Sequence, residues 1–316
     1  MMKKKIFKLP DELKFIAIGR LPQKYSRESM AGKTCVMTGT TSGVGYQAAI
    51  RLAKAGARIV MIVRNREKAE DLCAEIRILS SCPPDYYLAD FSRLSQVRKA
   101  AEAILAKYPK IDVLINNAGV HMTTRKLTEE GFETAFCVNH LASFLVTSLF
   151  LKRMVESAPS RIIYVNSEGH RFNGLKLDDL TWANRRYRGL GGYGASKTAQ
   201  LMTVWEFNDL LKGKGVTINA MHPGAVKSNI GHNNGKLYNL YSRYLIQPML
   251  KDPKISGEAI YYLASSPEME GVSGKFFNLT NEEIPAPHAM NRELGKKIFE
   301  KSKELTHLDQ DEVFEV

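Results

Sequence analysis

A tyrosine and a lysine stand four residues apart in the segment Tyr193-Gly194-Ala195-Ser196-Lys197. In a helix these two side chains lie on one face, about one turn apart, so an ammonium group would approach a phenol. A nearby positive charge favours the phenolate and lowers the pKa of tyrosine, which is otherwise ~10 and too high for acid–base work near neutral pH. The same spacing also occurs on solvated helix faces, so the pair predicts proton transfer only in combination with other features.

A glycine-rich turn follows an early β-branched run and precedes a segment of helical period, in Thr38-Gly39-Thr40-Thr41-Ser42-Gly43-Val44-Gly45. Glycine permits unusual torsions and close approach of a ligand, and a helix N-terminus offers free N–H groups to a pyrophosphate. A β–α turn without a ligand is the alternative. The sequence disfavours a nucleotide-hydrolysing P-loop, because no Gly-Lys-Ser/Thr follows. We predict dinucleotide binding through Gly39, Thr41, Ser42, Gly43, Val44 and Gly45.

The end of the second β-branched run carries basic residues where an acid would bind the ribose of NAD. It reads Ile62-Val63-Arg64-Asn65-Arg66. An acid at this point binds the ribose hydroxyls of NAD, whereas an arginine neutralises the 2′-phosphate of NADP. The sequence therefore favours NADP(H), with Arg64 and Asn65 as contacts. A solvated Arg64 and an NAD(H) cofactor are the alternative.

From Lys33 onward, short β-branched runs alternate with segments of helical period. This alternation is typical of a parallel sheet covered by helices on both faces. It predicts one doubly wound, seven-stranded sheet of the α/β class. Strands are predicted at 34–38, 58–63, 86–90, 113–116, 161–167, 216–222 and 274–279. Helices are predicted at 43–56, 66–80, 93–108, 132–156, 193–212, 256–265 and 289–305.

No repeat or low-complexity linker divides this pattern, so we predict one domain over residues 31–316 after a basic extension over residues 1–30. Two stretches, about 171–192 and 225–254, are too long for ordinary loops. We expect both to shape a substrate pocket, because ligands bind at the carboxyl ends of the strands in such sheets. Apolar residues on helical spacing within 237–250 would either roof a lipophilic ligand or pack a lid helix on the domain.

Charge and cysteine content exclude several classes of protein. Of the net charge of +12, residues 1–33 supply +6 from nine basic and three acidic groups, so the domain itself has no nucleic-acid signature. Four cysteines without Cys-x-x-Cys or His-Glu-x-x-His spacing predict neither a disulfide scaffold nor a metal site. We expect no membrane span, no signal peptide and a cytoplasmic protein. The extension, with Lys3-Lys4-Lys5 before apolar residues, would either contact an anionic membrane peripherally or dock on the domain.

Further motifs appear in an order that one family uses throughout. The chain over about residues 31–280 resembles the short-chain dehydrogenase/reductases. The motifs that carry this resemblance are the glycine turn, Asp90 after the third strand, Asn116-Asn117-Ala118-Gly119 after the fourth, Ser167 at the end of the fifth, Tyr193 with Lys197, and Pro223-Gly224 after the sixth. The segments 136–141, 222–226 and 262–277 are similar to the retinol dehydrogenase-like branch of that family.

The resemblance implies a Rossmann-type fold and assigns roles to the site. Tyr193 would be the general acid in reduction, and Lys197 would lower its pKa and hold the nicotinamide ribose. Ser167 would hydrogen-bond the carbonyl oxygen, and Asn139 would fix a water for proton relay. Further cofactor contacts are implied for Asp90, Asn117, Ala118, Gly119, Pro223, Gly224, Val226 and Ser228.

Ser167 lies 26 residues before Tyr193, a wider gap than most family members have, although the retinol dehydrogenase-like branch carries an insertion there. Many members dimerise through helices like those predicted at 132–156 and 193–212. The resemblance therefore leaves a homodimer open, although a helix face buried within one chain would show the same pattern.

These features together predict an NADP(H)-dependent oxidoreductase. Its substrate would be a small lipophilic aldehyde or ketone, such as a retinal-like polyene, a steroid or a polycyclic ketone, and the corresponding alcohol. The alternatives are an NAD-dependent alcohol dehydrogenase and a catalytically silent, NADP-sensing regulator on the same fold. A serine hydrolase is excluded because Gly-x-Ser-x-Gly is absent.

Overall fold

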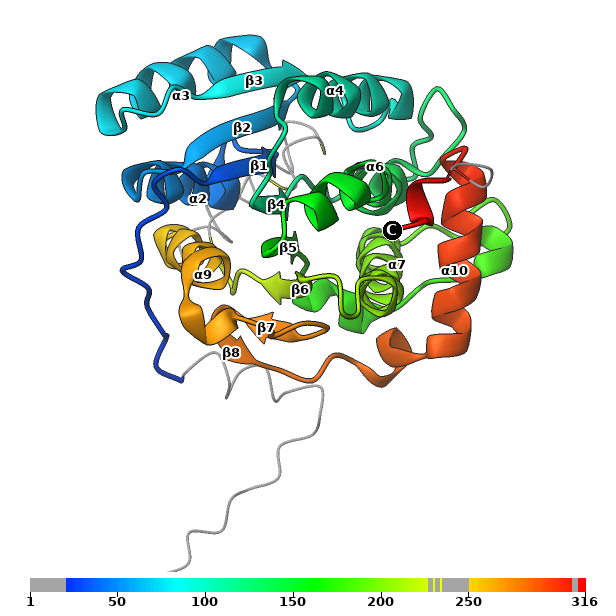
Figure 1. The fold of residues 1–316 in the computed structure, drawn as a ribbon. Coiled ribbons are helices and arrows are strands. Elements are labelled where there is room, and N and C mark those ends of the chain that lie inside the picture. The colour runs from blue at the N-terminus through cyan, green and yellow to red at the C-terminus, as the bar shows by residue number, and fades with distance from the viewer. Residues whose placement is uncertain (1–20, 227–229, 231–233, 235–249, 309–311) are drawn as a thin grey trace, which may run out of the picture.

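The computed structural model describes residues 21–226, 230, 234, 250–308 and 312–316. Its strands form one sheet in the order β3-β2-β1-β4-β5-β6-β7-β8 (Figure 1). Neighbouring strands from β3 to β7 pair in parallel, which confirms the doubly wound α/β fold. The strands are β1 Thr34–Thr38, β2 Arg58–Val63, β3 Asp85–Leu88, β4 Val113–Asn116, β5 Ser160–Val165, β6 Val216–His222, β7 Phe276–Asn278 and β8 Asn281–Glu282.

The prediction of seven strands was wrong by one. The chain turns back after β7, and β8 pairs with it in antiparallel register, Phe277 opposite Glu282 and Asn278 opposite Asn281. Leu279 in this turn has a φ of +56°, which allows the tight reversal. A strand of two residues carries no alternating pattern, so hydrophobic periodicity cannot reveal it.

The order of the strands places a switch point beside β1. This strand pairs with β2 on one side and with β4 on the other, so the chain winds outward in both directions from it. Successive β1 side chains serve opposite faces of the sheet: Val36 packs in one hydrophobic core, and Cys35 and Met37 pack in the other. Ligands of such sheets bind at the carboxyl ends of the strands around this point.

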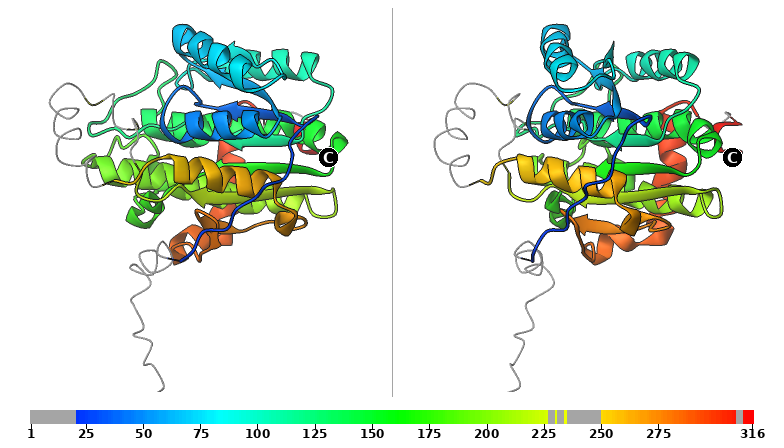
Figure 2. Two further views of the ribbon diagram at one scale, coloured as in Figure 1. Left: turned by 90° about the vertical axis from the view of Figure 1, so that its left-hand side faces the viewer. Right: turned by 60° about the vertical axis from the view of Figure 1, so that its left-hand side comes forward.

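Two helical layers cover the sheet (Figures 1 and 2). One core is shared by α2, α3 and α9, and the other by α4, α6, α7 and α10. Their bounds are α2 Gly43–Lys54, α3 Arg66–Leu79, α4 Leu94–Lys107, α6 Ala142–Glu156, α7 Gly189–Leu210, α9 Lys254–Ser265 and α10 Arg292–Leu305.

Two helices near the site differ from their predicted bounds. The predicted helix 132–156 consists of a short turn, Thr134–Phe136, a π-helical turn, Cys137–Leu141, and then α6. The helix predicted to begin at 193 begins at Gly189. Three glycines, Gly189, Gly191 and Gly192, have low helix propensity but are helical here. Tyr193 therefore lies in the second turn of α7 rather than at its first residue.

By length and composition, one described helical stretch, Thr134–Glu156, could cross a membrane, but 89% of its most apolar window is buried inside the domain. Phe144 on α6 packs against Phe207, Phe299 and Phe314. The stretch is thus a core helix, covered by α10 and by the C-terminal turn Glu312–Phe314.

Part of the N-terminal extension lies against the domain. Gln23 Oε1 accepts hydrogen bonds from the backbone N–H and the hydroxyl of Thr280, at 3.1 and 2.8 Å. Lys24 Nζ forms an ion pair with Glu268 at 2.6 Å, and Ser26 and Met30 are buried. Residues 21–30 therefore follow α9 and the β7–β8 turn, whereas the basic and apolar run predicted to meet a membrane, within 1–20, lies outside the described residues.

Candidate active site

A cavity of about 1260 Å³ opens at the carboxyl ends of the central strands. It brings together every described residue that the sequence assigns to the site except Asn139, which is buried behind it. Ser228 and the segment 237–249 of the predicted substrate loop lie outside the described residues. The predicted residues that line the cavity are Gly39, Thr41, Ser42, Gly43, Val44, Gly45, Arg64, Asn65, Asp90, Asn117, Ala118, Gly119, Ser167, Tyr193, Lys197, Pro223, Gly224 and Val226.

The glycine turn places the N-terminus of α2 at one end of this cavity. Gly39 and Gly43 have φ values of +67° and +57°, which residues with side chains rarely adopt. A Cβ on Gly45 would lie 2.3 Å from the carbonyl oxygen of Gly39, so a larger residue forces a shift of the backbone. The Ser42 side chain does not cap the helix. The first N–H groups of α2 therefore fit a pyrophosphate.

The end of β4 holds this turn in place. Thr38 Oγ1 accepts hydrogen bonds from the backbone N–H groups of Asn117 and Ala118, both at 2.9 Å. Asn117 Nδ2 donates to the carbonyl oxygens of Thr38 and Gly39, at 3.0 and 2.8 Å. The Asn117 side chain thus fixes the two strand ends against each other, and the backbone of this segment is what faces the cavity.

The cavity is basic where β2 ends. Arg64 is exposed at the end of β2, and Asn65 caps α3 by accepting a hydrogen bond from Lys68 N at 2.8 Å. Lys68, four residues after Arg64, also lines this end and was missed by the sequence reasoning. The spacing of four residues could have revealed Lys68, because it places this lysine about one helical turn beyond Arg64. Asp90 shapes the turn after β3, where its Oδ1 accepts from Ser92 N and Oγ, at 2.9 and 2.8 Å.

Ser167, two residues after β5, lies with its hydroxyl beside the phenol of Tyr193. Its Oγ accepts a hydrogen bond from Gly169 N at 3.0 Å. This contact occupies a lone pair and leaves the hydroxyl proton to donate. A Cβ on Gly169 would lie 2.4 Å from Tyr193 Cε1, so Gly169 leaves room for the phenol ring next to Ser167.

Burial controls the protonation of Tyr193 and Lys197. Burial raises the pKa of Tyr193 to about 12, although a hydrogen bond with Ser167 opposes the shift. Burial lowers the pKa of Lys197 to about 7. The Lys197 ammonium donates to the Val165 carbonyl oxygen at 2.9 Å and to Gln200 Oε1 at 3.2 Å. The spacing of Tyr193 and Lys197 predicts a lowered pKa for the tyrosine. In this arrangement burial has the larger effect, so Tyr193 is a neutral phenol.

Asn139 lies in the π-helical turn, behind the wall of the cavity. Its Oδ1 accepts from Val120 N at 2.7 Å, and its Nδ2 donates to the Val120 carbonyl oxygen and to Ser196 Oγ, both at 2.9 Å. Its own carbonyl oxygen accepts from Gln200 Nε2 at 2.6 Å. Gln200, which the sequence reasoning missed, therefore links Asn139 to Lys197 through one carboxamide.

His121 is a second residue that the sequence reasoning missed. Its ring meets the ring of Tyr193 edge to face, with centroids 5.5 Å apart, and it lines the cavity. Burial lowers the pKa of this imidazole, so it faces the cavity in its neutral form near pH 7. No motif marks a lone histidine two residues after Asn117-Ala118-Gly119, and only the fold brings it to Tyr193.

Comparison with known proteins places the chain in a family. The model of the short chain dehydrogenase family matches residues 33–238. Retinol dehydrogenase 13 of Homo sapiens is 36% identical over 296 residues, which cover 92% of this chain and 89% of that protein.

Two solved structures share the fold. A Mycobacterium paratuberculosis protein has a TM-score of 0.71 and 28% identity, and the match covers 89% of this chain and 95% of the other. A Beutenbergia cavernae structure that contains bound NADP has a TM-score of 0.63 and 25% identity, covering 79% and 96%. The glycine turn and the serine, tyrosine and lysine at one cavity agree with these likenesses: the chain is a short-chain dehydrogenase/reductase of the retinol dehydrogenase-like branch, an oxidoreductase that acts on alcohol and carbonyl groups with a nicotinamide cofactor.

Proposed function

We propose that this protein interconverts a lipophilic aldehyde or ketone and its alcohol, with NADP(H) as the hydride carrier. The observation that carries the proposal is the meeting of Ser167, Tyr193 and Lys197 with the glycine turn in one cavity. A silent regulator on the same fold would not need this set, whereas a reductase needs every member of it.

Arg64 and Lys68 support NADP(H) over NAD(H). Both line the cavity where β2 ends, and neither has a carboxylate partner among the ion pairs of the described residues. A 2′-phosphate carries close to two negative charges, which two flexible cations at this point would neutralise. An acid here would instead repel that phosphate and favour the ribose of NAD.

The side chains of this chain provide the proton chemistry of a carbonyl reduction. When bound, the nicotinamide supplies the hydride. Negative charge then develops on the substrate oxygen, where Ser167 donates a hydrogen bond and Tyr193 donates its proton. Tyr193 as a buried phenol is in the form that a general acid requires. Lys197 Nζ lies 6.0 Å from the centre of the Tyr193 ring, so its positive charge stabilises the phenolate that forms when Tyr193 gives up its proton.

The lip of the cavity supports a lipophilic substrate. Phe172 and Leu190 line the cavity, and their side chains are 58% and 53% exposed. Ile230 also lines the cavity. Exposed apolar side chains that line a cavity favour an apolar ligand body, while His121 and Ser167 receive its polar end.

The first test is oxidation of NADPH, followed at 340 nm, across a panel of lipophilic aldehydes and ketones with NADH in parallel. We expect turnover with NADPH and at least tenfold less with NADH. Equal rates with both carriers would show that Arg64 and Lys68 do not select the cofactor. Tight NADPH binding without turnover of any compound would support the regulator instead.

The covered faces of α6 and α7 support a monomer. Helix α10 packs on α7, and the C-terminal turn packs on α6, so the helices that would form a dimer in many relatives are covered by the chain itself. We expect a mass near 35.5 kDa in light scattering coupled to size exclusion. A mass of twice that value would refute this expectation.

A further inference from the structure

The segment that follows β8, Glu283–His288, lies far beyond residues 33–238 that the family model matches, yet it binds the loop that follows Ser167. Arg171 Nη2 donates to Glu283 Oε1 at 2.6 Å and to the Ile284 carbonyl oxygen at 3.2 Å. The Glu283 side chain is 1% exposed. A charged group this deeply buried is stable only with such partners, so the contact between the two segments is held firmly.

His170 connects the same segment to Ser167 itself. Its Nε2 accepts a hydrogen bond from Ala286 N at 3.0 Å. In the neutral imidazole the proton therefore resides on Nδ1, which lies 2.7 Å from the Ser167 carbonyl oxygen and donates to it. His288 Nε2 in turn lies 2.8 Å from the His170 carbonyl oxygen. A continuous chain of hydrogen bonds thus runs from Ala286 through a fully buried imidazole to the catalytic serine.

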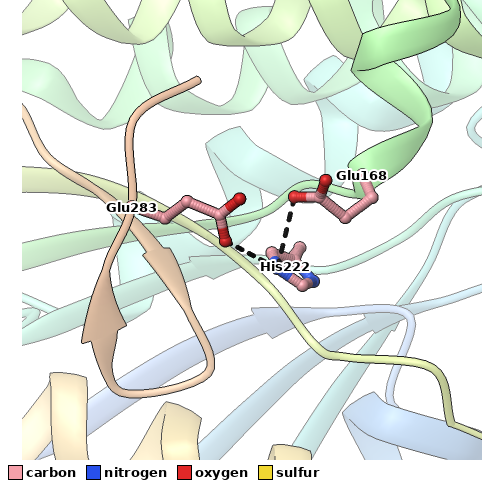
Figure 3. A group of neighbouring side chains, drawn as sticks. All are labelled: Glu168, His222 and Glu283. Atoms are coloured by element: carbon pink, nitrogen blue, oxygen red, sulfur yellow. Dashed lines mark hydrogen bonds and ion pairs between the residues drawn. The ribbon is translucent and has the colours of Figure 1, made fainter. Parts of the chain in front are cut away.

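A second connection passes through His222, the last residue of β6 (Figure 3). Its Nε2 lies 3.3 Å from Glu168 Oε1 and 3.4 Å from Glu283 Oε2. Its Nδ1 accepts a hydrogen bond from Gly224 N at 3.2 Å. Glu283 thereby fixes the backbone of Pro223-Gly224, which lines the cavity beside the serine loop.

Glu168, His222 and Glu283 offer three ligand atoms within 4.8 Å of one another, a grouping that could suggest a metal site. Two observations oppose it. His222 Nδ1 accepts a hydrogen bond from Gly224 N, so in the neutral ring Nε2 carries the hydrogen and has no lone pair for a metal. Arg171 already bridges the two carboxylates, at 2.5 Å from Glu168 and 2.6 Å from Glu283. Arg171 therefore supplies the positive charge that the two carboxylates need, and a metal ion is not required.

We propose that the segment Glu283–His288 positions the active site: it fixes the catalytic Ser167 through His170, and it fixes the Pro223-Gly224 loop through His222. His170, His222 and Glu283 are positioning residues, since they act through groups that line the cavity. The inference rests on the proposed function, because it gives this segment a role in that reaction. It also places a positioning segment of the site outside residues 33–238, which the family model matches.

Two substitutions of His170 separate the two ends of its hydrogen-bond chain. In His170→Asn the amide nitrogen takes the place of Nδ1 and keeps the bond to Ser167. In His170→Gln the amide oxygen takes the place of Nε2 and keeps the bond to Ala286 alone. We expect kcat to fall about tenfold in the glutamine variant and about threefold in the asparagine variant, with the dissociation constant of NADPH within twofold of the wild type.

His170→Gln in a Ser167→Ala background tests whether His170 acts through the serine. We expect His170→Gln to cause no further loss of the residual activity there, because the group it positions is gone. A tenfold loss in both backgrounds, or an unchanged kcat in the single variant, would overturn the assignment of His170.

Glu283→Gln tests the segment against a matched control. Glu282→Gln removes the neighbouring carboxylate, which forms only an exposed ion pair with Lys275 at 2.8 Å. We expect Glu283→Gln to weaken NADPH binding about fivefold and to speed amide hydrogen exchange in a peptide covering residues 166–172, while Glu282→Gln changes neither. Equal behaviour of the two variants would contradict the proposal.

The exchange measurement needs no substrate, so it keeps the two proposals separate. If no carbonyl compound is reduced by the wild type, the proposed function fails, and the exchange of residues 166–172 still shows whether Glu283 holds the serine loop. If Glu283→Gln does not fold, the His170→Asn variant supplies the same comparison, with faster exchange expected near residue 286. Unchanged exchange in a folded variant would refute the positioning role.

Discussion

The two ends of the cavity are built on different principles. The end proposed for the cofactor consists mainly of backbone, with Arg64 and Lys68 added: a glycine turn, the N-terminus of α2 and the strand ends of β1 and β4, all within the first 120 residues. The catalytic end consists of buried side chains whose partners lie far away in sequence, such as Lys197 with Val165 and His170 with Ala286. The first end needs particular backbone conformations, and the second needs a network of hydrogen bonds. Substitutions should therefore damage the two ends in different ways.

Tyr193→Phe should have the largest effect on turnover. Removing the hydroxyl deletes the general acid, whose contribution is typically ~10²–10⁴ in rate. The ring remains in the space beside Gly169, so NADPH binding should stay within twofold of the wild type. Single-turnover rates and fluorescence titration with NADPH measure the two quantities. Activity near that of the wild type would remove Tyr193 from the mechanism.

Gly45→Ala should damage the cofactor end instead. The added Cβ would approach the Gly39 carbonyl oxygen and Asn117 Nδ2 within 2.4 Å, so the turn must shift. Strain of this kind costs ~1–3 kcal/mol, and we expect NADPH to bind about 10–100-fold more weakly. Gly213→Ala is a control without a steric clash, since a Cβ there meets nothing within 4 Å and only the φ of +74° opposes the alanine. Unchanged NADPH affinity in Gly45→Ala would show that the turn tolerates the shift.

Arg64→Ala should change the choice of cofactor more than the rate. Loss of one exposed cation from a phosphate contact should weaken NADPH binding about tenfold, and NADH binding should not change. Lys68→Ala should act in the same direction and more weakly, because Lys68 lies a helical turn further along α3. Titrations with both cofactors at low and high salt measure these effects. An equal loss for NADH would mean that Arg64 supports the fold and does not select the phosphate.

Acid should weaken the catalytic half first, through its buried histidines. Burial lowers the pKa of His140 to about 3 and that of His170 to about 4. The unfolded chain binds a proton at each histidine below about pH 6.5, whereas the folded chain does not until pH 3–4. Stability should therefore fall as the pH drops through this window, by about 1.4 kcal/mol per pH unit for each histidine.

Urea unfolding between pH 7 and pH 4.5 measures this loss of stability. All seven histidines lie at position 121 or later, so none belongs to the glycine turn or to β1 and β2. His170→Asn should reduce the dependence on pH, and substitution of the exposed His307 should leave it unchanged. A pH dependence that is the same in all three proteins would contradict the burial argument.

The contrast between the two ends explains what the sequence could predict. The glycine spacing and the alternation of strands and helices are local patterns, and they predicted the doubly wound sheet and the dinucleotide turn. Tyr193 and Ser167 were located by motifs at strand and helix ends. Gln200, His121 and Glu283 could not be found in that way, because their contacts join segments whose proximity is a property of the folded chain alone.

The start of α7 and the short strand β8 were misjudged for a related reason. Glycines at 189–192 indicate a break by propensity, yet tertiary packing against Trp182 and Tyr187 holds them in a helix. β8 is held by its pairing with β7 and by the burial of Glu283, neither of which leaves a periodic signal.

The π-helical turn at Cys137–Leu141 has a consequence for insertions and deletions. Such a turn holds one residue more than a regular α-helix would need. Deletion of a single residue between 137 and 141 would restore regular winding and rotate everything before it by about 100° relative to α6. Asn139 would then turn away from Val120 while the apolar face of α6 kept its packing. The length of this turn, and not only the identity of its residues, is therefore under constraint.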